Sequence, residues 1–297
     1  MEKCLAEVHV SVLSGEVLEY LKPESGKVYV DGTLGLGGHA FSILRATEPD
    51  GKVVGFEWDD QAAKLAAQRL EVFGRRLCLI RESYAQLLAG LEQHGIETID
   101  GLLLDLGTSS LQLDTGERGF SFQIDAPLDM RMDRSQQETA AKLVNRLSKD
   151  ELADIFYNYG EERQARRIAA HLVKAREKGP IETTRQLAEL VAWAIPRKYH
   201  PRKKHVATKV FQALRIAVNR ELDNLVRILT DAPSVLASGG RICVITFHSL
   251  EDRIVKQSFV NNPAYRVVTS KPVGPAASEV AVNPRARSAK LRVAERV

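Results

Sequence analysis

The chain has 297 residues, 44% of them hydrophobic, which suits one large domain or two modest ones with a sizeable core. A net charge of +4 fits a nucleic-acid partner without requiring one. The spacing of Cys4, Cys78 and Cys243 matches neither a zinc site nor a disulfide framework, and no cluster of side chains calls for a metal. Because neither a signal peptide nor an apolar run of membrane-spanning length is apparent, we expect a cytoplasmic protein without a membrane partner.

The first third of the chain alternates short apolar runs with helical patterns. Strands are predicted at 27–31, 52–57, 77–80 and 99–105, with helices at 38–47, at 60–73 and between the third strand and residue 94. Asp59 or Asp60 is placed to cap the second of these helices. Such alternation predicts βαβ units and a parallel sheet, in which the apolar run Leu102–Leu104 is a central strand buried on both faces.

A different pattern follows between about 114 and 201, where only helices are predicted, at 139–146, 149–157, 161–177 and 184–194. The α/β pattern then resumes with one long helix at 205–232, a turn at Gly239-Gly240, a strand at 241–247, a helix at 250–260, and strands at 265–269 and 289–294 separated by a loop at 271–287. The sequence therefore predicts an α/β protein. Its Rossmann-like core, 1–113 plus 205–297, is mostly parallel with antiparallel C-terminal strands, and an all-helical insertion, 114–204, interrupts it.

The turn after the first strand reads Asp31-Gly-Thr-Leu-Gly-Leu-Gly-Gly-His39, and Glu57 ends the second strand. Glycines let the backbone approach a ligand closely, and an acid at the second strand's end suits the hydroxyls of a ribose. Nicotinamide-, flavin- and S-adenosylmethionine-binding proteins share such a turn. Two features favour S-adenosylmethionine: Gly35-x-Gly37-Gly38 departs from the dinucleotide spacing, and Asp31 would repel a pyrophosphate but receive an ammonium group.

Polar residues also follow two later strands of the predicted sheet. Asp105 ends the fourth strand and lies at the same sheet edge as the glycine turn, where it either caps a helix or accepts a hydrogen bond from the cofactor or a substrate amine. His248 and Ser249 follow the fifth strand. They either border the substrate or serve the next helix, with Ser249 as its cap and Glu251-Asp252 in its first turn.

Several longer motifs occur in order along nearly the whole chain. They are Asp31-Gly-Thr-Leu-Gly-Leu-Gly-Gly-His39, Leu103-Leu-Asp-Leu-Gly-Thr-Ser-Ser110, Glu117-Arg-Gly-Phe-Ser-Phe122, Pro127-Leu-Asp-Met-Arg-Met-Asp133, Tyr159-Gly-Glu-Glu-Arg163, Phe211-Gln-Ala-Leu-Arg-Ile-Ala-Val-Asn219, Phe247-His-Ser-Leu-Glu-Asp-Arg253 and Asn283-Pro-Arg-Ala-Arg-Ser288. Together they resemble the ribosomal RNA small subunit methyltransferase H family. That resemblance implies a methyltransferase core with a helical insertion, which methylates N4 of a cytidine in the decoding region of bacterial 16S rRNA.

The resemblance also implies roles for single residues. Cofactor contacts fall on Gly37, Gly38, His39, Glu57, Tyr84, Asp105 and Gln112. The family usually has aspartate where Glu57 stands and often phenylalanine where Tyr84 stands. Methylation of an amine needs no covalent intermediate and no catalytic cysteine, only in-line alignment and acceptors for the amine as its charge grows. The candidate catalytic residues are therefore Asp105, His248 and Ser249.

Basic side chains form three groups that suit phosphate contacts, although a charge run is as often a solvated surface. The stretch 197–205 has five Lys or Arg and no acid. The candidate RNA-binding residues are Arg163, Arg166, Arg197, Lys198, Arg202, Lys203, Lys204, Arg285 and Arg287. We expect the target cytidine to be splayed out of its stack. The expected partner is 16S rRNA, within the 30S subunit, and the sequence leaves open whether the protein is a monomer or a homodimer.

Two other functions stay open on the sequence. An NAD-dependent dehydrogenase would use the same core, although the glycine spacing speaks against it. A non-catalytic RNA-binding protein would explain the basic groups but leaves Glu57 and Asp105 without a use. Thermal stabilisation by S-adenosylmethionine, S-adenosylhomocysteine or NAD distinguishes these functions.

Overall fold

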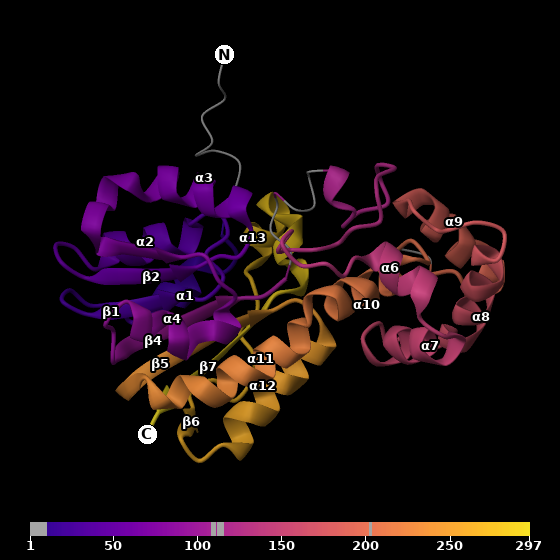
Figure 1. Cartoon of the computed structure of the whole chain (residues 1–297). Helices are drawn as coiled ribbons and strands as arrows, with labels where there is room; N and C mark the ends of the chain where they lie inside the picture. The colour runs from indigo at the N-terminus through magenta and orange to yellow at the C-terminus, as the bar shows by residue number, and fades with distance from the viewer. Residues whose placement is uncertain (1–10, 108–110, 112–115, 202–203) are drawn as a thin grey trace. The chain divides into compact units, whose positions relative to one another are not determined.

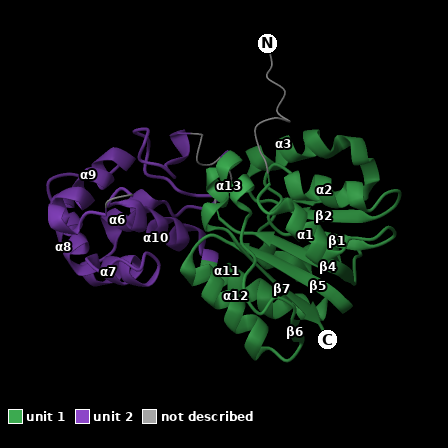
Figure 2. Cartoon of the chain, turned by 180° about the vertical axis from the view of Figure 1, so that it is seen from behind, with its two compact units in different colours: residues 1–107, 222–297 green, residues 108–221 purple. Residues whose placement is uncertain are grey.

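The computed structural model describes residues 11–107, 111, 116–201 and 204–297 (Figure 1). The chain forms two compact units, coloured separately in Figure 2: a core unit of residues 1–107 and 222–297, and a helical unit of residues 108–221. The helical unit is longer than the predicted insertion of 114–204, because residues 205–221 pack with its other helices. Within the described part of the chain, every helix is too short or too polar to cross a membrane.

Seven strands form one sheet in the core unit, in the order β3-β2-β1-β4-β5-β7-β6. The first five pair in parallel, whereas β7 runs antiparallel to both β5 and β6. This confirms the predicted Rossmann-like α/β core with antiparallel C-terminal strands. The strands are β1 (Val28–Asp31), β2 (Lys52–Phe56), β3 (Leu77–Ile80), β4 (Ile99–Asp105), β5 (Leu236–Thr246), β6 (Tyr265–Val267) and β7 (Lys290–Arg296).

Helices cover both faces of the sheet, so the central strand β4 is buried on both sides. Leu102 and Leu104 face the cluster that includes residues of α4, α11 and α12, and Leu103 faces the cluster under α1, α2 and α3 (Figure 1). Asp59 caps α3, because its side chain accepts hydrogen bonds from two backbone N–H groups of the first turn. The helices of this region are α1 (Ser14–Leu21), α2 (Gly38–Ala46), α3 (Asp60–Leu70), α4 (Leu87–Gln93), α11 (Glu221–Asp231), α12 (Ser249–Asn261) and α13 (Ala277–Val282).

Five helices build the helical unit, as far as its residues are described. Capping boxes start α7 and α9: Ser148 pairs with Glu151, and Thr183 pairs with Gln186. The helices are α6 (Ala140–Arg146), α7 (Lys149–Asn158), α8 (Ala165–Arg176), α9 (Thr184–Ala194) and α10 (Thr208–Asn219). Short 3-10 helices of the whole chain are η2 (Glu71–Arg76), η3 (Tyr84–Gln86), η4 (Gly116–Arg118), η5 (Arg197–Tyr199), η6 (Ala232–Ser234) and η7 (Pro284–Ser288).

Four sequence predictions of local structure are wrong at particular backbone positions. The helix expected at 205–232 breaks at Arg220, whose φ of 52° is left-handed, so α10 and α11 are separate. The helix expected from residue 161 starts only at Ala165, because Glu161 also has a positive φ. The turn expected at Gly239-Gly240 is a kink inside β5, which already begins at Leu236. The loop expected at 271–287 contains α13 and η7.

Candidate cofactor site

Three carboxylates lie at the carboxyl edge of adjacent strands in the core unit. Asp31 ends β1, Asp105 ends β4 and Glu57 follows β2. Thr33, which the sequence analysis did not single out, links the first two: its hydroxyl accepts a hydrogen bond from the Asp105 N–H at 2.6 Å, and its own N–H donates to Asp31 Oδ1 at 3.2 Å. The sequence pattern that points to Thr33 is a short hydroxyl side chain two positions after the acid that ends the strand.

The glycine turn between β1 and α2 packs too closely for larger residues. Gly37 has a φ of 76°, and a Cβ there would lie 2.8 Å from Leu70 Cδ1. A Cβ at Gly38 would lie 2.0 Å from Ser11 Oγ. The positive φ at Gly37 strongly favours glycine there, whereas at Gly38 a larger residue would require the Ser11 side chain to move. Gly35 also has a positive φ, of 54°.

His39, near the start of α2, is buried beside the carboxylates. Its Nε2 atom lies 3.5 Å from Asp105 Oδ2. Burial lowers the pKa of His39, but the neighbouring carboxylates of Asp105, Asp31 and Glu279 more than offset this effect, so the pKa lies above its ordinary value. Glu279, on α13, was not anticipated from the sequence; its carboxylate also accepts a hydrogen bond from the Leu13 N–H at 2.8 Å.

Asp31 is only 1% exposed, and burial raises its pKa to about 6 despite the opposing effect of His39. Four buried polar atoms in this cluster make no hydrogen bond within the described residues: Asp31 Oδ2, Asp105 Oδ1, and both ring nitrogens of His39. Buried polar atoms are normally paired, so this cluster is built to receive a polar ligand.

Glu57 fastens the glycine turn to the end of β2. Its Oε2 accepts a hydrogen bond from the Gly35 N–H and its Oε1 from the Asp59 N–H, both at 2.8 Å. Burial raises the pKa of this carboxyl to about 8, although both N–H groups act against the shift. Each carboxylate oxygen keeps a second lone pair, which suits a ribose hydroxyl.

The remaining predicted cofactor contacts lie around the same turn. Tyr84 begins η3 after β3, and its Cβ would lie 3.2 Å from a Cβ at Gly32. Its side chain is buried within the core cluster that also contains Val54 and Leu104. Gln112 lies outside the described residues.

His248 caps α12, whereas the sequence analysis had considered Ser249 for that role. The Nδ1 atom of His248 accepts from the Glu251 N–H at 3.4 Å, and Glu251 Oε2 accepts from the N–H groups of Phe247 and His248. This capping box makes Glu251 a buried structural residue that the sequence analysis placed only in the first turn. Ser249 is exposed at the first position of the helix.

The predicted RNA-binding residues occur on both units, and all that the structure describes are exposed. Arg163 lies in the turn before α8 and Arg166 in its first turn, Arg197 and Lys198 lie in η5, and Lys204 precedes α10. In the core unit, η7 carries Arg285 and Arg287 on either side of the buried Ala286. Arg202 and Lys203 lie outside the described residues.

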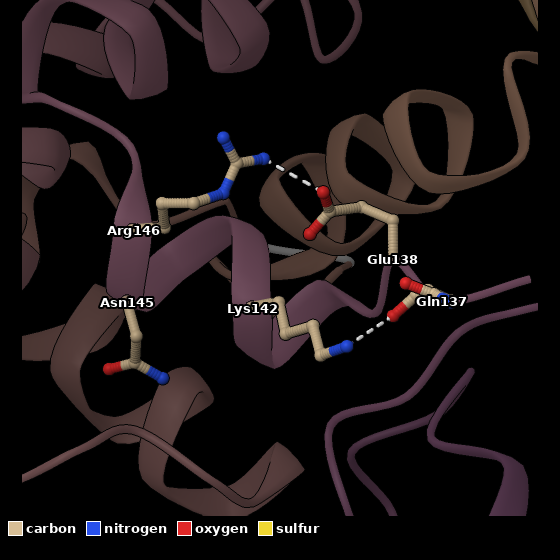
Figure 3. A pocket seen from close by; sticks show the side chains of 5 residues that line it. All are labelled: Gln137, Glu138, Lys142, Asn145 and Arg146. Atoms are coloured by element: carbon tan, nitrogen blue, oxygen red, sulfur yellow. Dashed lines mark hydrogen bonds and ion pairs between the residues drawn. The ribbon is translucent and has the colours of Figure 1, made fainter.

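A pocket of about 420 Å³, lined by five polar residues, opens on the helical unit and contains none of the predicted site residues. In Figure 3, Arg146 points to Glu138 and the Lys142 ammonium points to the backbone oxygen of Gln137. These contacts measure 2.8 Å and 2.6 Å. The fifth lining residue, Asn145, fastens Ile181 through two hydrogen bonds. The charged side chains that line the pocket therefore mostly pair with one another or with the backbone, and we assign this pocket no role.

In the core unit, the site combines an excess of carboxylates, unpaired acceptor atoms and a closely packed glycine turn. Its complement is a ligand with cationic groups and hydroxyl donors rather than one with phosphates. S-adenosylmethionine has an ammonium group, a sulfonium and two ribose hydroxyls, so the residues present fit it.

Comparison with known proteins identifies the family of this chain. The model of the MraW methylase family matches residues 6–297. A protein of Desulfotalea psychrophila named "Ribosomal RNA small subunit methyltransferase H" is 57% identical over 291 residues, covering 98% of this chain and 99% of its own. Proteins of the same name from Geotalea uraniireducens and Geobacter sp. strain M21 are each 51% identical, covering 97% of this chain and 98% of theirs. The chain therefore belongs to the MraW methylase family, and S-adenosylmethionine is its cofactor.

Proposed function

We propose that this methyltransferase acts on 16S rRNA and methylates N4 of a cytidine in the decoding region. Two lines of support meet here. Relatives more than half identical over nearly the full length are named for the small ribosomal subunit's RNA. The single structural observation that carries the chemistry is Asp105, a strand-ending carboxylate with an unpaired Oδ1 beside the cofactor turn.

In this proposal, each candidate cofactor residue is assigned a part of S-adenosylmethionine, and the geometry of the core unit supports the first of these assignments. Asp31, with its unpaired Oδ2, receives the ammonium group, and the turn of Gly35, Gly37 and Gly38 with His39 surrounds the methionine portion. Glu57 accepts hydrogen bonds from the two ribose hydroxyls. The ring of Tyr84 flanks the adenine, and Gln112 completes the set.

N4 of cytosine is a poor nucleophile, because its lone pair is delocalised into the ring. The bound cofactor supplies an electrophilic methyl carbon. Asp105 accepts a hydrogen bond from the amine and stabilises the positive charge that grows there during direct in-line transfer. The Nε2 atom of His39 lies 3.5 Å from Asp105 Oδ2 and helps to position that carboxylate. His248 and Ser249 border the target base.

No covalent intermediate is needed, and the two described cysteines do not supply a nucleophile. Burial raises the pKa of the Cys243 thiol to about 12, and burial also raises the pKa of Cys78. Both thiols therefore stay protonated near neutral pH, which is the unreactive form. Cys4 lies outside the described residues.

The substrate is the 30S subunit, because the target lies in a folded decoding centre. The exposed basic residues of both units contact phosphates, and the cytidine is flipped into the site. These contacts are made by Arg163, Arg166, Arg197, Lys198, Arg202, Lys203, Lys204, Arg285 and Arg287.

The decisive experiment is methylation of 30S subunits with methyl-labelled cofactor, followed by mapping of the modified base. We expect one labelled cytidine in the decoding region, with label at N4, and much less label on free 16S rRNA. Label on another base, or at C5 of the cytosine, would show that the proposal is wrong. A thermal-shift panel should show stabilisation by S-adenosylmethionine and S-adenosylhomocysteine but not by NAD.

A further inference from the structure

One face of α8 in the helical unit is exposed and strongly basic. Exposed residues recur at helical spacing through Arg166, Arg167, Ala170 and Lys174, and Arg163 is exposed in the turn just before the helix. Within the described residues, Arg163, Arg166 and Lys174 form no ion pair, so their charges are not neutralised by neighbours. Arg176 belongs to the opposite side of the helix, where it donates hydrogen bonds to two carbonyls of the α6 end.

Two exposed aromatic rings lie next to this basic face. Trp193, near the end of α9, is 71% exposed, and Tyr199, in η5, is 55% exposed. Arg167 ties the two helices together, because its Nε donates to the carbonyl of Ala194, the residue after Trp193. The Nε2 atom of His200 donates a hydrogen bond to the Ile195 carbonyl at 2.9 Å, which holds η5 against the end of α9. The Lys198 ammonium lies 5.0 Å from the centre of the Tyr199 ring.

We call Arg163, Arg166, Arg167, Lys174, Trp193, Arg197, Lys198 and Tyr199 the basic–aromatic surface. Lys198 lies over the Tyr199 ring, and Arg167 contacts the residue after Trp193. These two rings therefore lie beside cations, unlike a singly exposed ring such as Tyr157 on the acidic helix α7. The neighbouring helix α7 exposes the acids Asp150, Glu151 and Asp154 instead. The exposed acids beside the surface include Glu161, Glu177 and Glu189. Charge therefore directs a polyanion to the α8 side of this unit rather than to the α7 side.

We propose that the basic–aromatic surface binds unpaired nucleotides of the substrate rRNA, with phosphates on the cations of α8 and η5 and bases stacked on Trp193 and Tyr199. Flat, exposed rings between cations are how proteins hold single-stranded nucleic acid, since every base has a face to stack. A duplex hides these faces, so the surface prefers single strands. This inference rests on the proposed function and adds to it the form of RNA that the helical unit selects.

Fluorescence provides a direct test of stacking. The chain has two tryptophans, Trp58 and Trp193, so in the full-length Trp58→Phe variant the emission comes from Trp193 alone. Titration with a single-stranded oligoribonucleotide should quench this emission, and a duplex of the same sequence should quench it several-fold less at equal concentration. Equal quenching by both, or none by the single strand, would overturn the proposal.

Affinity measurements test the energetic part. The Trp193→Ala/Tyr199→Ala variant should bind the single strand at least tenfold more weakly, since stacking each base on a ring contributes about that factor or more. Tyr157→Ala is the matched control, because Tyr157 is 64% exposed on the acidic helix α7; it should leave the affinity unchanged. Equal reductions in both variants would show that the aromatic surface has no special role.

Salt dependence tests the binding of phosphates by the cations of α8. In Arg166→Gln/Lys174→Gln, the slope of log affinity against log salt should shrink by about 0.7 for each phosphate that the variant no longer neutralises. Lys142→Gln/Arg146→Gln removes the same charge from α6 and should leave the slope unchanged. If both pairs shrink the slope equally, only net charge matters and the surface is not the binding site.

Methylation of 30S subunits separates this inference from the proposed function. If the wild-type protein leaves N4 unmethylated, the proposed function is wrong whatever the surface binds. If it methylates N4 and the aromatic variant has an unchanged KM, cofactor affinity and RNA affinity, only the surface proposal is wrong. A raised KM on 30S subunits with unchanged affinity for naked RNA would assign the surface to a ribosomal protein and reject the RNA proposal.

Discussion

The Nε2 atom of His39 lies 3.5 Å from Oδ2 of Asp105, which joins the helix after the cofactor turn to the carboxylate that ends β4. Asp31 adds a second carboxylate to the same buried cluster. Glu279 also lies close enough to raise the pKa of His39, so acidic side chains outnumber basic ones in this cluster. We expect the cluster to attract a cationic ligand.

Asp105→Asn tests the proposed acceptor of the amine hydrogen bond. We expect kcat to fall at least about 100-fold, the lower range for loss of one hydrogen-bonding group that stabilises charge in the transition state, while S-adenosylhomocysteine affinity changes by less than about tenfold. Single-turnover methylation of 30S subunits and calorimetry measure the two quantities. Full turnover with intact cofactor affinity would remove Asp105 from the chemistry. Asp129→Asn, at a carboxylate that pairs with Arg131 in the helical unit, is the control.

Glu57 makes cofactor affinity depend on pH. Burial raises its pKa to about 8, so below that pH the carboxyl holds a proton in the free protein. Ribose hydroxyls donate best to the ionised form, so binding releases the proton. Affinity should therefore rise with pH, by up to about tenfold per unit, and level off above about 8. In Glu57→Gln the rise between pH 7 and 8 should disappear, while Glu57→Asp keeps an acid and a pH dependence. An unchanged profile in Glu57→Gln would contradict this assignment.

Gly37→Ala should lower both the stability of the protein and its affinity for the cofactor. The substitution forces alanine to a φ of 76° and places its Cβ 2.8 Å from Leu70. Left-handed backbone costs about 1–2 kcal/mol, and the packing conflict adds to this cost. Gly26→Ala is a matched control, since Gly26 has a φ of 75° with no atom near its Cβ position. Chemical denaturation should show a lower free energy of unfolding in both variants. Cofactor titration should show weakened binding in Gly37→Ala alone. Equal cofactor affinity in the two variants would mean that the turn does not contact the cofactor.

His248 separates a capping role from a role at the target base. Asparagine is a good helix cap, so His248→Asn should keep the stability of α12, whereas His248→Ala should lose about 1 kcal/mol. If the side chain also borders the cytidine, the KM for 30S subunits should rise in both variants. Urea denaturation and steady-state methylation measure these effects. Wild-type kinetics in His248→Asn would leave only the structural role.

The strands of the sheet are well predicted from the sequence, because strand signals are local. The β3, β4 and α9 segments begin and end where the apolar runs predict, and Asp59 caps α3 as its position suggests. The predictions fail where the φ angle of a single residue decides whether a helix or strand continues. Arg220 breaks the long helix without interrupting the apolar periodicity, so no pattern reveals the break. Gly239 likewise kinks β5 rather than ending it.

By itself, the sequence determined the α/β core, the glycine turn and the strand-ending acids, because periodicity and strand order place Asp31, Glu57 and Asp105 at one sheet edge. Only the tertiary structure decided which partners these acids have: Thr33 between two of them, and Glu279 brought from α13 to His39. Their distances and burial depend on residues hundreds of positions apart, and burial is what raises the pKa of Glu57 and Asp31. The same holds for Trp193, whose exposure no local pattern encodes.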